Sequence, residues 1–256
     1  MGKYSGILLL SDFDGTMFTG SEIPQNNIDA IRRFCAEGGS FGFSSGRTYE
    51  FFREFEDVVV PNTYISSVNG TVIYDYPNRQ VVLEKFIKED SQKKMLDICR
   101  DHENFRNIVI FNRSTVETLN IAGNTDLDDQ VNALMSEPVH KVMFHSRRPI
   151  SDSEKEDIVR FFGADYYVSR SWAEGIEIQS SDSTKGCAAR KIKELSGADL
   201  LVCAGDFEND ETMIAAADIG YAVENATEGL KRLADRITVS VDDGAIAAII
   251  DELGSI

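Results

Sequence analysis

Two aspartates separated by one residue, Asp12 and Asp14, follow the apolar run that ends at Leu10. If Gly6–Leu10 is a buried strand, alternate side chains at its end point to the same side, so the two carboxylates lie together. Carboxylates held this close repel, and a proton or a cation must relieve the repulsion. One of them could attack phosphorus while the other donates and accepts protons. The alternative interpretation is an aspartate cap with a glycine turn.

Two further polar clusters have the composition of a phosphate site. Ser45, Gly46 and Arg47 follow the predicted strand Ser40–Ser44, and a hydroxyl beside free backbone N–H groups suits phosphate oxygens. Lys185 begins a predicted helix, where the helix dipole disfavours a cation unless an anion lies near. An ordinary strand-to-helix turn and a solvated surface lysine are the alternatives.

A fourth cluster follows the apolar stretch 200–204. Asp206 stands where the predicted strand stops, and Asn209 and Asp210 lie in the first turn of the next helix. Mg²⁺ takes oxygen ligands, often one or two carboxylates together with waters and a phosphate oxygen. The cluster therefore predicts a magnesium site, with helix capping by acidic residues as the alternative.

Strand and helix patterns alternate in residues 1–78 and again in residues 181–256. This alternation predicts an α/β core with a doubly wound, mostly parallel sheet, in which ligands bind beyond the carboxyl ends of the strands. The four clusters should therefore meet at one edge of the sheet. The expected elements of residues 1–78 are strands at Gly6–Leu10, Ser40–Ser44 and Tyr64–Ser66, helices at Pro24–Glu37 and Tyr49–Phe55, and a hairpin turn at Asn69-Gly70. Those of residues 181–256 are helices at Lys185–Leu195 and Glu208–Ala217, strands at 198–206 and 218–223, and a helix–strand–helix tail.

Residues 79–180 have a different order of elements, which predicts a separate α+β domain inserted into the core. Its expected helices are Lys88–His102, Asp126–Ser136 and Ser151–Phe162, and its expected strands are 107–112, 114–123, 140–145, 164–169 and 175–179.

The composition excludes several classes of partner. The chain has 256 residues and a formal net charge of −17, which argues against binding to nucleic acid or to anionic membranes. Its apolar runs are too short to span a bilayer, and no signal-peptide core follows the first residues. The four cysteines are scattered without a C-x-x-C pair, so we expect free thiols and a cytoplasmic location. The sequence does not indicate the oligomeric state.

Taken together, the four clusters resemble the motifs of the haloacid dehalogenase superfamily of phosphohydrolases. Asp12-Phe13-Asp14-Gly15-Thr16 matches D-x-D-G-T, Ser45 and Lys185 match the second and third motifs, and residues 205–210 match G-D-x-x-N-D. The insert between the second and third motifs is similar to the type IIB cap domain of the Cof-type subgroup. The resemblance covers nearly the whole chain.

This resemblance implies a role for each matching residue. Asp12 would be the nucleophile, and Asp14 the general acid and base. Lys185 would bind the phosphate and balance the charge of Asp12. The other expected phosphate-binding residues are Ser45, Gly46, Arg47 and Asn209, and the expected Mg²⁺ ligands are Asp12, Asp206, Asp210 and the backbone carbonyl of Asp14.

The function that the resemblance implies is a Mg²⁺-dependent phosphatase that works through an aspartyl-phosphate on a small phosphorylated metabolite, for example a sugar phosphate. Two alternatives stay open, a phosphomutase of the phosphomannomutase type and a non-catalytic receiver-like phosphate-binding module. The cap would contact the leaving group, and the candidate residues for that contact are Asn112, Arg113, His145, Arg147, Arg148 and Trp172.

Overall fold

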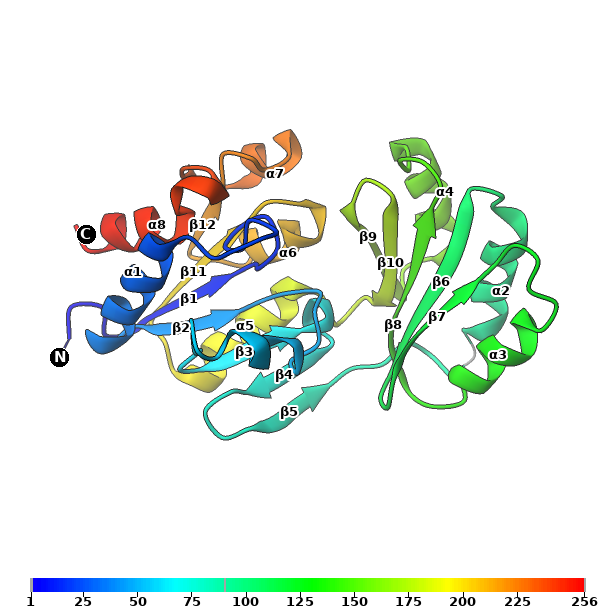
Figure 1. Ribbon diagram of the computed structural model, residues 1–256, viewed down its shortest axis with the longest axis horizontal. Coiled ribbons are helices and arrows are strands. Elements are labelled where there is room, and N and C mark those ends of the chain that lie inside the picture. The colour runs from blue at the N-terminus through cyan, green and yellow to red at the C-terminus, as the bar shows by residue number, and fades with distance from the viewer. Residues whose placement is uncertain (1, 90, 256) are drawn as a thin grey trace. The chain divides into compact units, whose positions relative to one another are not determined.

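The strand that precedes Asp12 lies inside a five-stranded parallel sheet of the computed structural model (Figure 1). The structure describes residues 2–89 and 91–255. The strand order is β13-β12-β11-β1-β2, and every pairing is parallel. The strands are β1 (Ile7–Ser11), β2 (Ser40–Phe43), β11 (Leu200–Gly205), β12 (Ile219–Ala222) and β13 (Arg236–Ile237).

Helices cover both faces of this sheet because successive side chains of β1 point to opposite sides. Leu9 packs into a cluster with α1 and α8, whereas Leu8 and Leu10 pack into a cluster with α5, α6 and α7. The doubly wound α/β core is therefore confirmed. The helices are α1 (Gln25–Ala36), α5 (Lys185–Ser196), α6 (Glu211–Ile214), α7 (Glu228–Leu233) and α8 (Ala245–Leu253).

The predicted third strand of the core belongs to a different sheet. β3 (Tyr64–Ser67) pairs antiparallel with β4 (Val72–Asp75), and β5 (Gln80–Glu84) completes a three-stranded sheet. A single bridge between Ser44 and Ser66 joins this sheet to the end of β2. The predicted Asn69-Gly70 turn does connect two strands, β3 and β4.

Two predicted helices of the core are shorter or tighter than expected. The segment around Tyr49–Phe55 contains only a 3₁₀-helix, η1 (Phe51–Phe55). The predicted helix Glu208–Ala217 is divided into a 3₁₀ turn, η3 (Glu208–Asp210), and the one-turn helix α6. In the second case backbone N–H groups donate to the side chain of Asp210, which holds the first turn in a tight loop.

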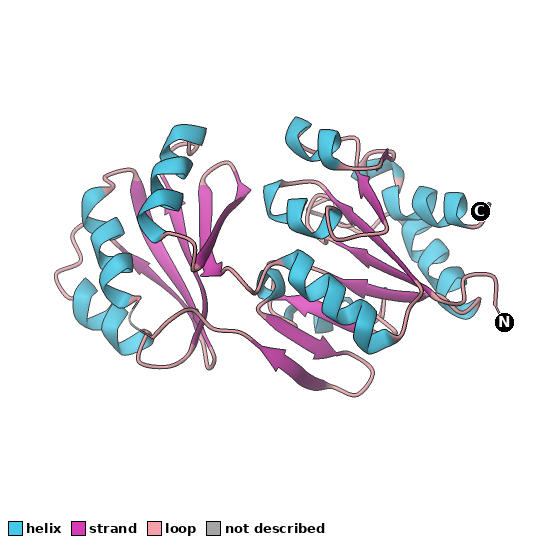
Figure 2. Cartoon of the chain, turned by 180° about the vertical axis from the view of Figure 1, so that it is seen from behind, coloured by secondary structure: helices cyan, strands magenta, loops and turns pink. Residues whose placement is uncertain are grey.

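The chain divides into two compact units, Met1–Leu83 with Thr184–Ile256, and Glu84–Ser183. The second unit has an antiparallel sheet with the order β7-β6-β8-β10-β9, and its helices pack on one face of that sheet (Figure 2). The strands are β6 (Phe105–Asn112), β7 (Val116–Asn120), β8 (Val139–Ser146), β9 (Tyr166–Trp172) and β10 (Gly175–Ser180). The helices are α2 (Gln92–Asp101), α3 (Leu127–Leu134) and α4 (Asp152–Phe162).

The second unit begins and ends a few residues later than the insert 79–180 expected from the sequence. The reason at its start is β5, which extends the three-stranded sheet of the first unit and so stays with that unit through Leu83.

Two expectations drawn from composition can be compared with the fold. All four cysteines lie in the described part of the chain, and all four are free thiols. Among the described residues, no helix has the length and apolar character that crossing a bilayer requires.

Candidate active site

The carboxylate of Asp12 lies just beyond the end of β1, inside the first unit. The backbone N–H of Asp12 donates a hydrogen bond to the carbonyl of Ala204 at 2.9 Å, which connects Asp12 to β11 as well as to its own strand. The side chain is buried, with 6% of the residue exposed. Phe13 is fully buried in an aromatic cluster that contains Phe51 and Phe55. The interleaved phenylalanine thus packs into the core, as the spacing predicts.

Lys185 brings its ammonium group to Asp12 from the first residue of α5. Its Nζ lies 2.6 Å from Oδ1 of Asp12 and 2.6 Å from Oδ1 of Asp210, and the side chain is fully buried. Thr184 caps the helix and accepts a hydrogen bond from the N–H of Cys187. A buried lysine requires paired charges, and two carboxylates supply them.

Asp206 and Asp210 complete a compact group of acids. One oxygen from each of Asp12, Asp206 and Asp210 lies within 4.8 Å of the other two. Asp210 Oδ2 accepts from the N–H groups of Asp206 and Phe207, which folds the loop after β11 around its carboxylate. Thr16 Oγ1 donates to Asp206 Oδ1 at 2.9 Å. The three predicted carboxylate ligands of the metal are therefore close together, with hard oxygen donors.

The acids of this group are difficult to ionise together. Burial, with the charge of Asp210 added, raises the pKa of Asp206 to about 7. Burial also raises the pKa of Asp12, although the charge of Lys185 opposes this shift. For Lys185, burial favours the neutral amine, but the charges of Asp12 and Asp210 outweigh burial and raise its pKa. Three carboxylates around one ammonium carry surplus negative charge, so the group suits a further cation.

Asp14 is placed differently from the other acids. Arg47 donates from Nε to Oδ2 and from Nη2 to Oδ1 of Asp14, both at 2.9 Å, which makes a bidentate ion pair. The hydrogen bond and charge of this carboxylate raise the pKa of Arg47. The two side chains are about half exposed. Asp14 thus lies at the open side of the site, while the carboxylate of Asp12 is buried.

Ser45 lies in a turn that is hydrogen bonded to the hairpin between β3 and β4. Its Oγ accepts from the N–H of Arg47 at 3.2 Å, and its carbonyl accepts from the N–H of Asn69 at 2.9 Å. Asn69 has a φ of 56°, and its Oδ1 accepts from Nδ2 of Asn209 at 3.3 Å. An alanine Cβ at Gly46 would lie 3.2 Å from that same Oδ1, so the turn approaches the hairpin closely. The structure therefore brings Ser45, Gly46 and Asn209 to one place.

Two glycines permit the close approach of the acidic loops. Gly15 has a φ of +84°, and a Cβ there would lie 2.6 Å from Asp206 Oδ2. At Gly205 a Cβ would lie 2.6 Å from the Cβ of Asp210. Any side chain at either position would push the carboxylates apart.

Thr16 and Asn69 are site residues to which the sequence analysis assigned no role. Thr16 stands inside the D-x-D-G-T motif, so its position was a usable signal for contact with the other acidic loop. The sequence pattern predicts only a turn at Asn69, and its partner Asn209 is 140 residues away in the chain. No local pattern could have found that contact.

The candidate cap residues all lie in the second unit, where several already have structural partners. Asn112 Oδ1 accepts from the N–H groups of Ser114 and Thr115, which closes the β6–β7 turn. Arg148 pairs with Glu154, and Arg113 pairs with Glu84. The rings of His145 and Trp172 contact each other, with centroids 5.3 Å apart, and Arg147 is exposed. Of the six candidates, the structure brings only this aromatic pair together in space across two strands.

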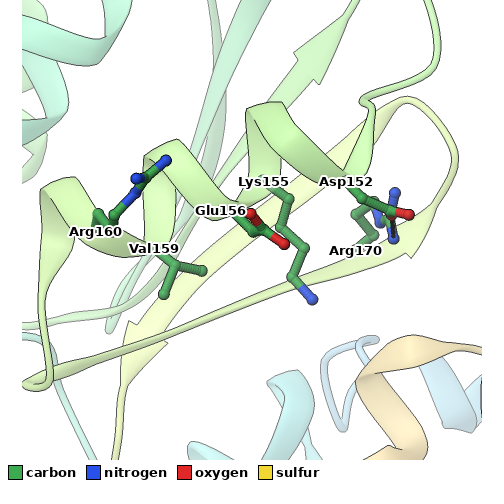
Figure 3. Close-up of a pocket in the computed structure, with 6 residues that line it drawn as sticks. All are labelled: Asp152, Lys155, Glu156, Val159, Arg160 and Arg170. Atoms are coloured by element: carbon green, nitrogen blue, oxygen red, sulfur yellow. Dashed lines mark hydrogen bonds and ion pairs between the residues drawn. The ribbon is translucent and has the colours of Figure 1, made fainter.

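A cavity of about 520 Å³ lies between α4 and β9 of the second unit. Figure 3 shows Asp152 of α4 beside Arg170 of β9, with Lys155 extending from α4. Arg170 donates to Asp152 Oδ1 at 2.7 Å and to the carbonyl of Ile150 at 2.8 Å. The lining has mixed charge, and none of the predicted phosphate or metal residues contributes to it.

Comparison with known proteins is consistent with these motifs. The family model described as haloacid dehalogenase-like hydrolase matches residues 9–250. The chain is 27% identical over 249 residues to the 5-amino-6-(5-phospho-D-ribitylamino)uracil phosphatase YcsE of Bacillus subtilis, with 94% of each chain covered. It is 23% identical over 288 residues to the phosphatase YwpJ of the same organism, covering 96% of this chain and 99% of that one.

Two solved structures share the fold. A haloacid dehalogenase-like hydrolase from B. subtilis superimposes with a TM-score of 0.79 at 22% identity, covering 96% of this chain and 99% of the other. A protein described as the subclass IIB sugar phosphatase BT4131 superimposes with a TM-score of 0.80 at 19% identity, covering 97% and 99%.

Proposed function

The chain belongs to the haloacid dehalogenase-like hydrolase family, and from this premise we propose that it is a Mg²⁺-dependent phosphatase acting through an aspartyl-phosphate on Asp12. The observation that carries the proposal is the buried contact of Lys185 with Asp12 and Asp210, beside Asp206. The family match and the named relatives identify the protein as an enzyme, a phosphoric monoester hydrolase of the haloacid dehalogenase type. The metal, the mechanism and the substrate are the parts that we propose.

The acidic group fits a magnesium ion in charge and in donor type. Asp12, Asp206 and Asp210 offer carboxylate oxygens within 4.8 Å of one another, and Lys185 alone does not balance their charge. These three residues, with the backbone carbonyl of Asp14, would hold the ion. When bound, Mg²⁺ would supply positive charge beside the phosphoryl oxygens.

In the first step, the carboxylate of Asp12 attacks the phosphorus of the ester. A bond forms between an Asp12 oxygen and phosphorus, and the bond from phosphorus to the leaving oxygen breaks. The leaving oxygen keeps the electron pair and takes a proton from the carboxyl group of Asp14. Lys185, the hydroxyl of Ser45, the N–H of Gly46 and the amide of Asn209 would hold the phosphoryl oxygens during this transfer.

In the second step, water hydrolyses the aspartyl-phosphate. Asp14, now a carboxylate, takes a proton from the water, and the water oxygen forms a bond to phosphorus. The bond between phosphorus and the Asp12 oxygen breaks, and its electron pair restores the Asp12 carboxylate. Inorganic phosphate leaves, and Asp14 holds a proton for the next cycle.

The substrate that we propose is a small phosphorylated metabolite, with sugar phosphates as the first class to test. The phosphatase names of the relatives and the described sugar phosphatase of the same fold support this choice. We also propose that Glu84–Ser183 acts as the cap that selects the leaving group, and that the protein works in the cytoplasm, which the four free cysteines support.

The test combines turnover with a matched pair of variants. Purified protein with Mg²⁺ should release phosphate from 4-nitrophenyl phosphate, and EDTA should stop the release. Asp12→Asn should lower kcat by about 10³-fold or more, because it removes the nucleophile. Asp251→Asn is the control, since Asp251 is an exposed partner of Arg33 outside the site, and its kcat should not change.

Three outcomes would contradict the proposal. Substantial turnover by a folded Asp12→Asn variant would exclude the covalent mechanism. A requirement for a bisphosphate, without net phosphate release, would favour a phosphomutase. Phosphate binding without turnover of any ester in a panel of phosphorylated metabolites would favour a receiver-like module.

A further inference from the structure

The proposed roles do not use the ion pair between Arg47 and Asp14. Both oxygens of the Asp14 carboxylate accept a hydrogen bond from the guanidinium group, each at 2.9 Å. Two parallel bonds of this kind fix the plane of the carboxylate as well as its position. A residue that only lined the phosphate pocket would not need this geometry.

Arg47 is itself held firmly at both ends. Its backbone N–H donates to Ser45 Oγ, and its carbonyl accepts from the N–H of Val68 and from Ser67 Oγ at 2.9 and 2.8 Å. Its guanidinium group lies over the ring of Phe51, 4.6 Å from the centroid. A cation over an aromatic face is stabilised there, so the side chain has little freedom to leave Asp14.

Phe51 connects this support to the strand that carries the acids. Its ring contacts Phe13 edge-on, with centroids 5.8 Å apart, and Phe13 is the residue between Asp12 and Asp14. The buried aromatic cluster therefore fixes the backbone of Asp14 through Phe13 and its carboxylate through Phe51 and Arg47. Both ends of the acid are positioned by the same packing.

The bidentate contact is available only to the unprotonated carboxylate, which is the form that the proposed second step requires. A carboxyl group that carried a proton on one oxygen could accept from the guanidinium at the other oxygen only. We propose that Arg47 is a positioning residue that acts through Asp14 in the second step, where Asp14 takes a proton from the attacking water. This inference rests on the proposed function, and it gives Arg47 a role other than binding the phosphate of the substrate.

The step itself is the hydrolysis described above. The water oxygen bonds to phosphorus, its proton passes to Asp14, and the electron pair of the broken bond returns to the Asp12 carboxylate. Arg47 orients Asp14 for the proton transfer and exchanges no atom. Loss of Arg47 should therefore slow hydrolysis of the aspartyl-phosphate and leave its formation nearly unchanged.

The experiment uses Arg47→Lys and Arg47→Gln with 4-nitrophenyl phosphate and Mg²⁺. General acid–base catalysis contributes about 10²–10⁴-fold, so we expect the loss of its positioning in Arg47→Gln to lower kcat by about 10–100-fold. KM should fall in parallel, since kcat/KM reports the first step. Rapid mixing should show a burst of nitrophenolate near one per enzyme, followed by a steady rate below that of the wild type. The decrease in kcat should be smaller for Arg47→Lys than for Arg47→Gln. An ammonium group keeps the positive charge but cannot hold both oxygens of the Asp14 carboxylate.

The matched control is Arg79, which has a similar setting outside the site. Arg79 pairs with Glu56, its guanidinium lies 4.5 Å from the centroid of the Tyr76 ring, and its side chain is 46% exposed against 48% for Arg47. Arg79→Gln should leave kcat and the burst as in the wild type. Thermal melting of both variants separates a folding defect from a catalytic one.

A second variant tests whether Arg47 acts through Asp14. The double variant Asp14→Asn with Arg47→Gln should hydrolyse the aspartyl-phosphate no more slowly than Asp14→Asn alone. Additive losses would overturn the inference, as would a raised KM with no burst in Arg47→Gln, which would mark a phosphate ligand. If the wild type turns over no phosphate ester, the proposed function fails and takes this inference with it.

Discussion

Each of the two compact units buries a lysine against carboxylates, but the balance of charge differs between them. In the first unit, Lys185 lies at the ends of parallel strands beside Asp12, Asp210 and Asp206. In the second unit, Lys141 of β8 pairs at 2.9 Å with Glu177 of the neighbouring strand β10, and both are almost fully buried. Lys185 contacts two carboxylates with a third close by, whereas Lys141 is paired with a carboxylate of the neighbouring strand inside a sheet. We expect the Lys185 group to matter most for turnover and the Lys141 pair to matter most for the stability of its sheet.

The largest expected effect comes from Lys185→Met. Removing the ammonium takes away the proposed phosphate ligand and leaves Asp12 and Asp210 to repel each other, so kcat should fall by about 10³-fold or more. Turnover of 4-nitrophenyl phosphate with saturating Mg²⁺ measures the loss, and circular dichroism checks that the variant is folded. A folded variant with near-normal kcat would remove Lys185 from the catalytic group.

In contrast to Lys185→Met, Lys141→Met should lower the stability of the protein and leave its kcat nearly unchanged. Breaking a buried ion pair by removing the ammonium of Lys141 should lower the free energy of unfolding by about 3 kcal/mol. The kcat per folded molecule should stay near that of the wild type. Urea unfolding and turnover measured on the same preparation check both parts.

The control for that variant replaces both partners. Lys141→Met combined with Glu177→Met should recover most of the lost stability, because an apolar pair of similar volume is often neutral or stabilising. A double variant that is no more stable than Lys141→Met would show that the pair is not the source of the effect.

The smallest expected effect concerns an acid whose pKa shifts in the direction opposite to that of Asp206. Arg148, together with Ser151, lowers the pKa of Glu154 from 4.5 to about 2 at the start of α4. Folding therefore favours the ionised form. The stabilisation is present above the ordinary pKa and is lost as the pH falls through the lowered one.

Glu154→Gln tests this shift. The variant should unfold about 1 kcal/mol more easily at neutral pH, and the difference from the wild type should shrink as the pH falls towards 2. Urea unfolding at a series of pH values measures it, with Glu156→Gln of the same helix as the control. A difference that is independent of pH would exclude the proposed linkage.

The sequence predicted the chemical groups of the site better than their contacts. The sequence predicts that Asp12, at a strand end, and Lys185, at a helix start, meet at one edge of the parallel sheet, and the fold places them 2.6 Å apart. The pairing of Arg47 with Asp14 was not predicted, since the direction of a long side chain depends on packing. Here the ring of Phe51 decides that direction.

In the core, too, the sequence predicts local elements better than the contacts between them. Tyr64–Ser66 has the composition of a core strand, and only its antiparallel pairing with β4 shows that it belongs to another sheet. Asn69 was visible as a turn residue, but its contact with Asn209 requires two segments that only the complete fold brings together. The residues missed by sequence are thus those whose role depends on a distant partner.

The position of β11 in the sheet determines how late in synthesis the acidic site can be completed. β1 pairs with β2 on one side and with β11 on the other, and Lys185 follows Asp12 by 173 residues. The ribosome therefore synthesises all of Glu84–Ser183 before it adds the lysine and the acidic loop of the first unit. The inserted unit can fold early, whereas Asp12 stays near an unpaired strand edge until the last quarter of the chain emerges. Catalytic competence is thus a late event of biosynthesis, and an interrupted translation product would carry the D-x-D motif without its counter-charge.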